Sequence, residues 1–455
     1  MIVILSDLHF SEAQSTKIGD LEFNRNLPAD TYQAYFEDLN QAAVENEIKR
    51  IDLVLAGDIL ELSRSGIWLD GEGRPYIDNK EVLPESNSEK VILQIIQAIS
   101  QEDKVAETLA IIRNIQDYFD VDVKVHYLLG NHDRLANATP AIRQQVRRIL
   151  GLEVGEGGQL FPPQYIGLDS RNRPFCLVRH GHEYDPMNFP VNTHLLEEIP
   201  TDFPDEVYGS ACLGDITTIE FGAALPNYFV EIYGEEEILQ DPTLMALYER
   251  LMAFDDVRPT TALLAYLFST PGVEKKRTWE LMAPCFTKAI QVITENEQFQ
   301  HFLKHSSSLK SGQRILLRVI LNSGLFSKMI PYWLIKRVMT RVSMTINLQS
   351  QSRWAKREAL IRNKASGCKC VVSGHTHFPE VSLISSEEGE ERYYINTGTW
   401  RNLIPATKDF DEFGTLRSMT RAIVFRPEED AISEDKTQWS FQYLSGYSFG
   451  NYRHF

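Results

Sequence analysis

The sequence predicts an α/β protein in which layered sheets are flanked by helices and interrupted by a large, mostly helical insertion. Short apolar, strand-like runs alternate with stretches of helical spacing in the first part of the chain, which is the pattern of a layered α/β domain. A segment of 181 residues, 186–366, is dominated by helical spacing, and strand-like runs return after it. We therefore expect a core formed by 1–185 and 367–455, with 186–366 as a helical cap.

The elements can be followed in order along the chain. Between the first two strand-like runs, 30–48 has helical spacing, with Asp30 or Thr31 as its expected cap. Several Gly and Pro residues in 63–88 predict an extended loop beside the functional site. Helical spacing returns in 89–118 and leads into the third run. The five runs are 2–5, 53–56, 123–129, 175–178 and 370–372.

A histidine or aspartate signature follows each run. Ligands at the carboxyl ends of strands in an open α/β sheet lie at one crevice, so these side chains are expected to converge. Imidazole and carboxylate suit manganese, iron or zinc, and a carboxylate can bridge two ions. The set contains no cysteine, which argues against a closed structural zinc site. A two-metal hydrolytic centre is the interpretation that fits. The signatures are Asp7-Leu8-His9, Gly57-Asp58, Gly130-Asn131-His132-Asp133, His180-Gly181-His182 and Gly374-His375-Thr376-His377.

In this order, the signatures resemble those of the calcineurin-like metallophosphoesterase superfamily. The resemblance covers 1–62, 120–185 and 367–402. It implies a metallophosphoesterase-type β-sandwich flanked by helices, whose catalytic core hydrolyses phosphate esters with two divalent ions. Manganese is the expected metal, with Fe²⁺, Zn²⁺ and Ni²⁺ as alternatives.

The resemblance also implies a role for each residue of the signatures. His180 is preferred over His182 because it directly precedes Gly181. His132 is expected beside the scissile group, oriented by Glu61 or Asp133. The ligands of one metal are expected to be Asp7, His9, Asp58 and His377, and those of the other Asp58, Asn131, His180 and His375, with Asp58 bridging and Asn131 also near the substrate.

Glu61 points toward a narrower substrate class. It stands three residues after Asp58, where many members of the superfamily have Asp, and is similar to the form in bacterial UDP-2,3-diacylglucosamine pyrophosphatases. Those enzymes usually have Arg in place of His132, so the similarity is partial. We expect hydrolysis of a phosphodiester or pyrophosphate by a metal-activated hydroxide, assisted by His132. A phosphomonoesterase, a nuclease and a metal-binding scaffold subunit without turnover are the alternatives.

Charge is distributed unevenly along the chain. The segment 309–364 has twelve basic residues and one acidic residue, so it carries +11 and the remainder of the −17 chain carries −28. Such a remainder argues against a long nucleic-acid track. Within the segment, Lys336, Arg337 and Arg341 share one helical face. This face is expected to bind a phosphorylated small-molecule or lipid-linked substrate or an anionic membrane, or to be an ordinary solvated cap surface.

The remaining features concern location and the C-terminal part. The apolar content of 43% allows a packed core. No apolar run approaches the ~18 residues that span a bilayer, and no basic leader precedes the first strand, so we expect a cytoplasmic protein, with peripheral membrane contact as an option. After the fifth signature, 393–396 reads as a strand. Arg401 is expected to reach a phosphate, with a surface role as the alternative. Five scattered cysteines are expected to be buried reduced thiols: Cys176, Cys212, Cys285, Cys368 and Cys370.

Overall fold

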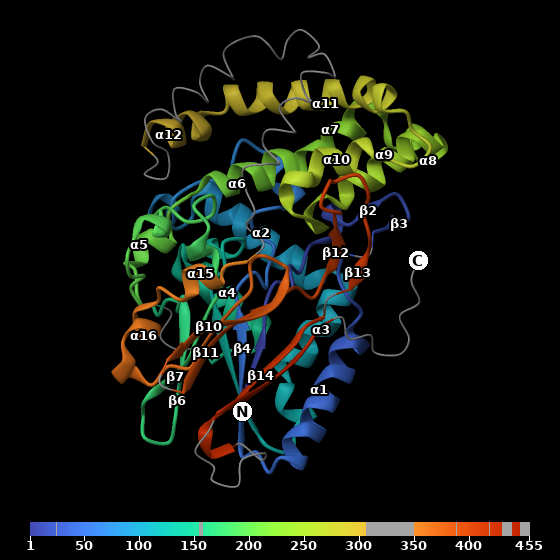
Figure 1. The fold of residues 1–455 in the computed structure, drawn as a ribbon. Helices are drawn as coiled ribbons and strands as arrows, with labels where there is room; N and C mark the ends of the chain where they lie inside the picture. The colour runs from blue at the N-terminus through green and yellow to red at the C-terminus, as the bar shows by residue number, and fades with distance from the viewer. Residues whose placement is uncertain are drawn as a thin grey trace.

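Two five-stranded sheets form the centre of the protein (Figure 1). The computed structural model describes residues 1–23, 25–153, 158–305, 350–387, 389–417, 419–429 and 439–445. Strand order is β15-β14-β1-β4-β5 in the first sheet and β10-β11-β9-β7-β6 in the second. Within the first sheet β1, β4 and β5 are parallel, and within the second β7, β9 and β11 are parallel. The α/β class predicted from the sequence is confirmed.

All five predicted runs correspond to strands, and at most one residue separates the end of each strand from its signature. The expected strand at 393–396 lies in β11. The first sheet contains β1 (Ile2–Leu5), β4 (Arg50–Ala56), β5 (Asp122–Leu128), β14 (Arg421–Phe425) and β15 (Ser440–Leu444). The second contains β6 (Gln164–Leu168), β7 (Pro174–Arg179), β9 (Cys370–Ser373), β10 (Pro379–Glu387) and β11 (Glu390–Thr397).

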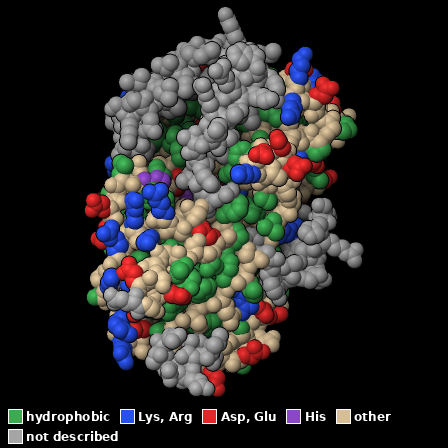
Figure 2. Space-filling view, viewed as in Figure 1, with side chains coloured by type: hydrophobic (Ala, Val, Ile, Leu, Met, Phe, Trp, Pro, Cys, Tyr) green, Lys and Arg blue, Asp and Glu red, His purple; other side chains and the backbone are tan. Residues whose placement is uncertain are grey.

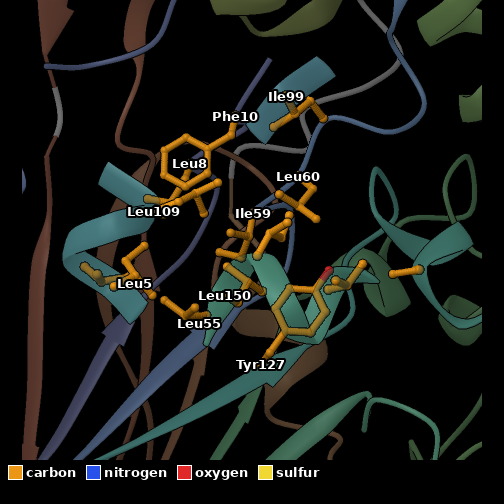
Figure 3. Close-up of a cluster of buried hydrophobic side chains, with 14 of the residues drawn as sticks. Leu5, Leu8, Phe10, Leu55, Ile59, Leu60, Ile99, Leu109, Tyr127 and Leu150 are labelled. Carbon is orange, nitrogen blue, oxygen red and sulfur yellow. The ribbon is translucent and has the colours of Figure 1, made fainter. Parts of the chain in front are cut away.

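The side-chain pattern of the strands explains the layers. Successive side chains of a strand point to opposite faces, so a strand covered on both faces is apolar throughout. Ile2 and Ile4 of β1 pack with Val178 of β7 and Val372 of β9 in a cluster between the two sheets. The outer face of the first sheet faces helices instead. Figure 3 shows this outer cluster, to which Leu5, Leu55, Ile99, Leu109 and Leu150 belong.

Four helices cover this outer face: α1 (Ala29–Glu45), α2 (Asn87–Gln101), α3 (Asp103–Arg113) and α4 (Pro140–Leu150). The helix predicted at 30–48 is α1, but the expected caps are wrong, because α1 begins after Pro28 and includes both residues. The helical stretch 89–118 divides at Glu102, whose carboxylate caps α3 by accepting from Val105 N at 2.9 Å. The predicted loop 63–88 contains two 3₁₀ turns, η2 (Gly66–Asp70) and η3 (Asn79–Glu81).

The described part of 186–366 is mostly helical, as predicted. Its larger helices lie at the end of the sheets toward which β1 runs from the N-terminus (Figure 1). α15 and α16 pack instead on the outer face of the second sheet. The helices are α5 (Asp205–Tyr208), α6 (Leu213–Thr217), α7 (Ala224–Tyr233), α8 (Glu235–Gln240), α9 (Pro242–Met252), α10 (Leu263–Phe268), α11 (Lys275–Glu295), α12 (Glu297–His305), α15 (Ser352–Ala355) and α16 (Ala359–Arg362).

Short strands join this insertion to the rest of the chain. β8 (Val257–Arg258) pairs in parallel with β12 (Asn402–Pro405), which follows the fifth signature. β12 also pairs with β13 (Leu416–Arg417), and β2 (Lys17–Ile18) pairs with β3 (Leu21–Glu22). The β8–β12 pairing was not predicted, and it fixes the segment around Arg258 next to the signatures.

Only part of the predicted basic stretch can be assessed. The helical face with Lys336, Arg337 and Arg341 lies outside the described residues. Figure 2 shows Lys and Arg side chains gathered on the left of this view, where α15 and α16 lie. Lys364 there pairs with Glu387 at 2.8 Å, so some of this charge is neutralised.

Two other expectations concern bulk properties. In the part of the chain that the structure describes, no helix combines the length and the apolar character needed to cross a bilayer. All five cysteines are buried and free, as predicted.

Candidate metal centre

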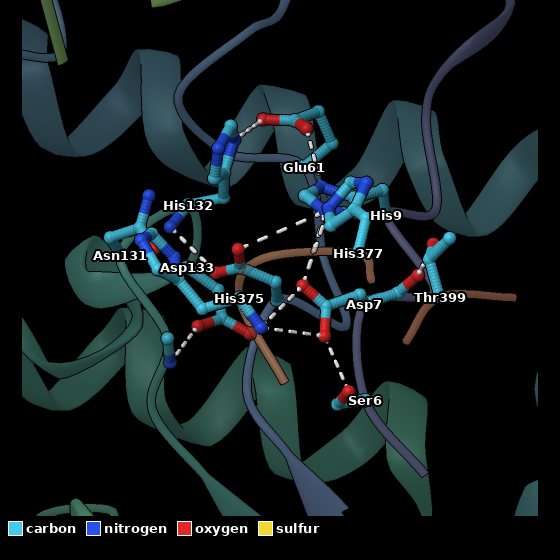
Figure 4. Close-up of polar contacts among 12 residues, drawn as sticks. Ser6, Asp7, His9, Glu61, Asn131, His132, Asp133, His375, His377 and Thr399 are labelled. Atoms are coloured by element: carbon cyan, nitrogen blue, oxygen red, sulfur yellow. Dashed lines mark hydrogen bonds and ion pairs between the residues drawn. The ribbon is translucent and has the colours of Figure 1, made fainter. Parts of the chain in front are cut away.

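The five signatures meet where β1, β4, β5, β7 and β9 end. Among the described residues, three sets of side chains each bring three potential ligand atoms within 4.8 Å of one another. We call two of them the Asp7 group (Asp7, His9, His377) and the Asp58 group (Asp58, His180, His375). The third set is His9, Glu61 and His132, and it shares His9 with the Asp7 group. Figure 4 shows several of these side chains pointing toward one another from different strands.

Backbone pairing beyond the sheet aligns the first two signatures. His9 N donates to Asp58 O at 2.9 Å, and Phe10 N donates to Ile59 O at 2.9 Å. Glu61 N donates back to Phe10 O at 3.0 Å. The loops after β1 and β4 therefore run side by side, which brings His9 next to both Asp58 and Glu61.

The backbone is strained at the ligand positions. A positive φ in a residue other than glycine costs on the order of 1–3 kcal/mol and persists only where the surroundings enforce it. Such strain concentrates at functional sites. Five of the seven predicted ligands have it: Asp7 (54°), His9 (46°), Asp58 (53°), His375 (68°) and His377 (59°).

Glycines in the signatures make room for the carboxylates. A Cβ on Gly130 would overlap Oδ1 of Asp58, and a Cβ on Gly374 would overlap Oδ2 of Asp7. Each glycine therefore lets a loop from another strand approach a carboxylate closely, which explains its place in the signature.

Nitrogen atoms face each other in the Asp7 group. Nε2 of His377 lies 3.0 Å from Nε2 of His9 and 3.3 Å from Oδ1 of Asp7. The other nitrogen of His9, Nδ1, lies 2.8 Å from Oε2 of Glu61. A carboxylate only accepts, so Nδ1 donates to it and the lone pair of His9 is on Nε2, directed at the group.

The Asp58 group also has an imidazole whose Nδ1 donates away from the group and whose Nε2 faces it. Nδ1 of His180 donates to Ala56 O at 3.0 Å, which leaves Nε2 as the nitrogen that can take a proton or a metal. This Nε2 lies 3.0 Å from Oδ2 of Asp58 and 3.2 Å from Oδ1 of Asn131. Burial lowers the pKa of His180, but the carboxylates of Asp58 and Asp7 outweigh it and raise the pKa to about 10. The group thus stabilises positive charge.

Asp58 lies between the two groups. Its Oδ2 is 3.8 Å from Nε2 of His9, in addition to its contact with His180. Its Oδ1 accepts from His132 N at 2.8 Å. Asp58 is therefore the carboxylate that lies within reach of both groups.

His375 is oriented by a residue that the sequence did not indicate. Nε2 of His375 lies 3.1 Å from Oδ2 of Asp185, so it donates to this carboxylate and leaves Nδ1 for a metal. The backbone N of His375 donates to both oxygens of Asp7 at 3.1 Å. Asp185 follows the fourth signature by three residues, in no spacing that would mark it.

Arg258 contacts His377 from the insertion. Its Nη2 lies 2.7 Å from Nδ1 of His377. Arginine has donors only, so Nδ1 accepts and the neutral ring has its proton on Nε2. Burial, then the charge of Arg258, lowers the pKa of His377 well below its usual value, so the ring is neutral. A metal on Nε2 requires Nδ1 to be protonated and Arg258 to turn away.

Glu61 connects the Asp7 group to His132. Oε1 of Glu61 lies 2.7 Å from Nδ1 of His132, while Oε2 accepts from His9. Burial lowers the pKa of His132, but the carboxylates of Glu61 and Asp58 raise it to about 9. Glu61 is therefore the residue that orients His132.

Asp133 has a different role from the one expected. Its carboxylate accepts from Gly130 N at 2.6 Å, from Ile59 N at 3.0 Å and from the Tyr127 hydroxyl at 2.7 Å. These bonds fix the turn after β5 against the loop after β4. Asp133 thus holds the loop and does not orient His132.

Two other expected residues can now be placed. Among the described residues, the groups that could hold a metal include His180 but not His182, whose pKa burial lowers to about 4. The side chain of Arg401 is 1% exposed, and its Nη2 lies 3.0 Å from Oδ1 of Asp256. The surface alternative for Arg401 is therefore wrong, because the insertion covers it.

The geometry fits a metal centre, since imidazole nitrogens and carboxylates converge in two adjoining groups. No protein-family model matches the chain. A search of curated proteins found no match either.

Proposed function

We propose that the protein is a two-metal phosphoesterase of the calcineurin-like metallophosphoesterase superfamily that cleaves a phosphodiester or pyrophosphate. The observation that carries the proposal is the position of Asp58 between two groups of potential ligands, with Nε2 of His9 and Nε2 of His180 facing its carboxylate. The two packed sheets and the order of the signatures support the same family.

The donor set also bears on the metals. Mixed imidazole, carboxylate and amide ligands suit Mn²⁺, with Fe²⁺, Zn²⁺ and Ni²⁺ as alternatives. When bound, a pair of such ions polarises phosphoryl oxygens and lowers the pKa of water. Asp7, His9, Asp58 and His377 would hold one ion, and Asp58, Asn131, His180 and His375 the other.

His132 provides acid catalysis in this proposal. Its Nδ1 donates to Glu61, so Nε2 is the nitrogen that can hydrogen-bond to the leaving oxygen. The carboxylate of Glu61 stabilises the imidazolium and thereby keeps a proton available at Nε2 for transfer. Because Glu61 also holds His9, one side chain aligns the proton donor with a metal ligand.

A substrate panel tests the proposal. It consists of p-nitrophenyl phosphate, its bis ester, nucleotide pyrophosphates, cyclic nucleotides and single-stranded DNA, each with added Mn²⁺. We expect turnover of the bis ester or of nucleotide pyrophosphates, abolished by EDTA. Preferred cleavage of the monoester or of DNA would support the phosphatase or the nuclease instead. Absence of turnover of every substrate with Mn²⁺, Fe²⁺, Zn²⁺ and Ni²⁺ would favour the alternative of a metal-binding scaffold subunit without turnover.

A further inference from the structure

Four arginines gather around two aspartates beside the Asp7 group. We call this set the arginine cluster. The aspartates and one arginine come from the insertion, and the other arginines come from loops of the core. The members are Arg25, Arg64, Arg258 and Arg401, with Asp255 and Asp256.

One carboxylate serves three of the arginines. Oδ2 of Asp255 lies 2.5 Å from Nη2 of Arg25 and 2.6 Å from Nε of Arg64. Nη1 of Arg401 lies 3.9 Å from the same oxygen. Arg258 makes its contacts with Asp255 through the backbone carbonyl alone, at 2.6 Å.

Positive charge is therefore in excess. Counted over the described members, four guanidinium groups face two carboxylates. The carboxylate of Glu61, which accepts from Arg64 N, also accepts from His9 and His132. Buried charges are costly unless they are paired. The pKa of Arg64 reflects this, because burial and the charge of Arg25 lower it to about 10.

Several donors of the cluster also lack acceptors. Among the described residues, Nε, Nη1 and Nη2 of Arg401 make no hydrogen bond, although the side chain is 1% exposed, and the ion pair of Nη2 with Asp256 is not aligned as one. The same holds for Nε of Arg25 and of Arg64, where the ion pair of Arg64 is not aligned as a hydrogen bond. An arginine presents five N–H groups in a rigid, planar arrangement. The N–H groups without a partner therefore point in fixed directions, in which an anion could accept hydrogen bonds.

The cluster adjoins the metal centre. Arg258 contacts His377, and Arg64 N donates to Oε1 of Glu61 at 3.0 Å. If His377 ligated a metal through Nε2, Nη2 of Arg258 would lose its acceptor, while Nε and Nη1 would keep theirs on the backbone carbonyls of Thr376 and Asp255. Arg258 is partly exposed and the Asp255 side chain is 20% exposed, so these two form the accessible side of the cluster.

We infer that Arg25, Arg64, Arg258 and Arg401 form an anion subsite that binds a second phosphoryl group of the substrate, the group that is not cleaved. Phosphoryl oxygens match the guanidinium fork, and their negative charge offsets part of the excess positive charge. The assignment of the anion as part of the substrate rests on the proposed phosphoesterase function. Anion binding by the cluster does not depend on that function, because it can be measured without turnover.

The first experiment is calorimetric titration of the full-length protein with inorganic pyrophosphate in EDTA. Arg258→Met should weaken binding at least ~10-fold, as expected for a lost charge-assisted hydrogen bond. Asp255→Asn should strengthen binding, because it removes the resident competitor. The control is Arg250→Met in α9, whose guanidinium packs over the Tyr266 ring at 4.0 Å and should not affect binding. A purely structural network predicts that Asp255→Asn weakens binding or has no effect, and either result overturns the subsite.

The second experiment asks which phosphoryl group binds. Because Arg258 contacts the predicted ligand His377, the wild-type protein and the variant are first titrated to saturation with Mn²⁺. Arg258→Met should then raise KM for a nucleotide pyrophosphate at least ~10-fold more than KM for bis(p-nitrophenyl) phosphate. Equal increases for both substrates would mean that the arginines meet the reacting phosphoryl group, which overturns the assignment to a second group. If neither substrate turns over, the proposed function fails while the EDTA titration still decides the subsite.

Discussion

Oδ2 of Asp58 lies 3.0 Å from Nε2 of His180, although Asp58 follows β4 in one sheet and His180 follows β7 in the other. The contact joins the carboxyl ends of the two sheets. The same oxygen is 3.8 Å from Nε2 of His9, so Asp58 is within reach of both ligand groups. Changes at this carboxylate should therefore affect both groups at once.

Asp58→Asn should lower the bound metal and abolish turnover, because an amide cannot supply the bridging negative charge. Metal analysis and activity assays of the purified variant measure both effects. Asp52→Asn is the matched control. Asp52 is also a buried aspartate, but it lies near the start of β4, whereas Asp58 follows the end of this strand. Full metal content and full activity in Asp58→Asn would remove the basis of the assignment.

His180→Ala should cost more metal affinity than His182→Ala. Nε2 of His180 faces Asp58 and Asn131, whereas Nδ1 of His182 lies 3.5 Å from Oε2 of its neighbour Glu183. Metal titrations of the two variants give the ranking. Greater loss in His182→Ala would make His182 the ligand.

His132→Ala should retain metal and reduce the rate by about 10²–10⁴-fold, the usual range for loss of an acid–base group. Glu61→Gln should reduce the rate and also weaken metal binding by about 10–100-fold, because Glu61 orients the ligand His9 as well. Kinetics and metal titrations of both variants separate these roles. Loss of metal in His132→Ala would contradict the assignment of His132 as a proton donor.

Asp52 should make stability depend on pH at acid pH. Burial raises its pKa, but hydrogen bonds from His126, Arg50 and Arg426 outweigh burial and hold the pKa below its usual value. The ionised Asp52 carboxylate stabilises the folded state. This contribution is complete above the unfolded-state pKa of about 3.9 and is lost as pH falls toward the lower folded-state pKa. Asp52→Asn should thus be less stable than wild type at pH 7, with the difference shrinking below about pH 4. Denaturant unfolding between pH 7 and pH 3 measures this, and a difference independent of pH would refute it.

Much of the fold and of the candidate site could be predicted because the information is local. Ile2–Leu5 and its counterparts are buried on both faces, so they are visible as apolar runs. The glycines beside the predicted ligands could also be recognised in the sequence. The carboxylates of Asp58 and Asp7 approach Gly130 and Gly374 so closely that no side chain fits there.

The remainder depends on tertiary placement. The pairing of β1 with β14 joins Ile2 to Val424 across nearly the whole chain, and local spacing does not specify such a partner. Arg258 reaches His377 because β8 pairs with β12, and Asp185 reaches His375 through a turn without a distinctive pattern. The cap of α1 was misplaced because the polar residues Asp30 and Thr31 lie inside the first turn.

The central claim is that two ions share Asp58. Titration of the wild-type protein with Mn²⁺, followed by electron paramagnetic resonance, tests it most directly, because ions held about 3.5–4 Å apart are magnetically coupled. The account predicts saturation at two ions per chain, with the exchange-coupled spectrum of a manganese pair. Saturation at a single ion, or two ions with the spectrum of isolated Mn²⁺, would contradict it.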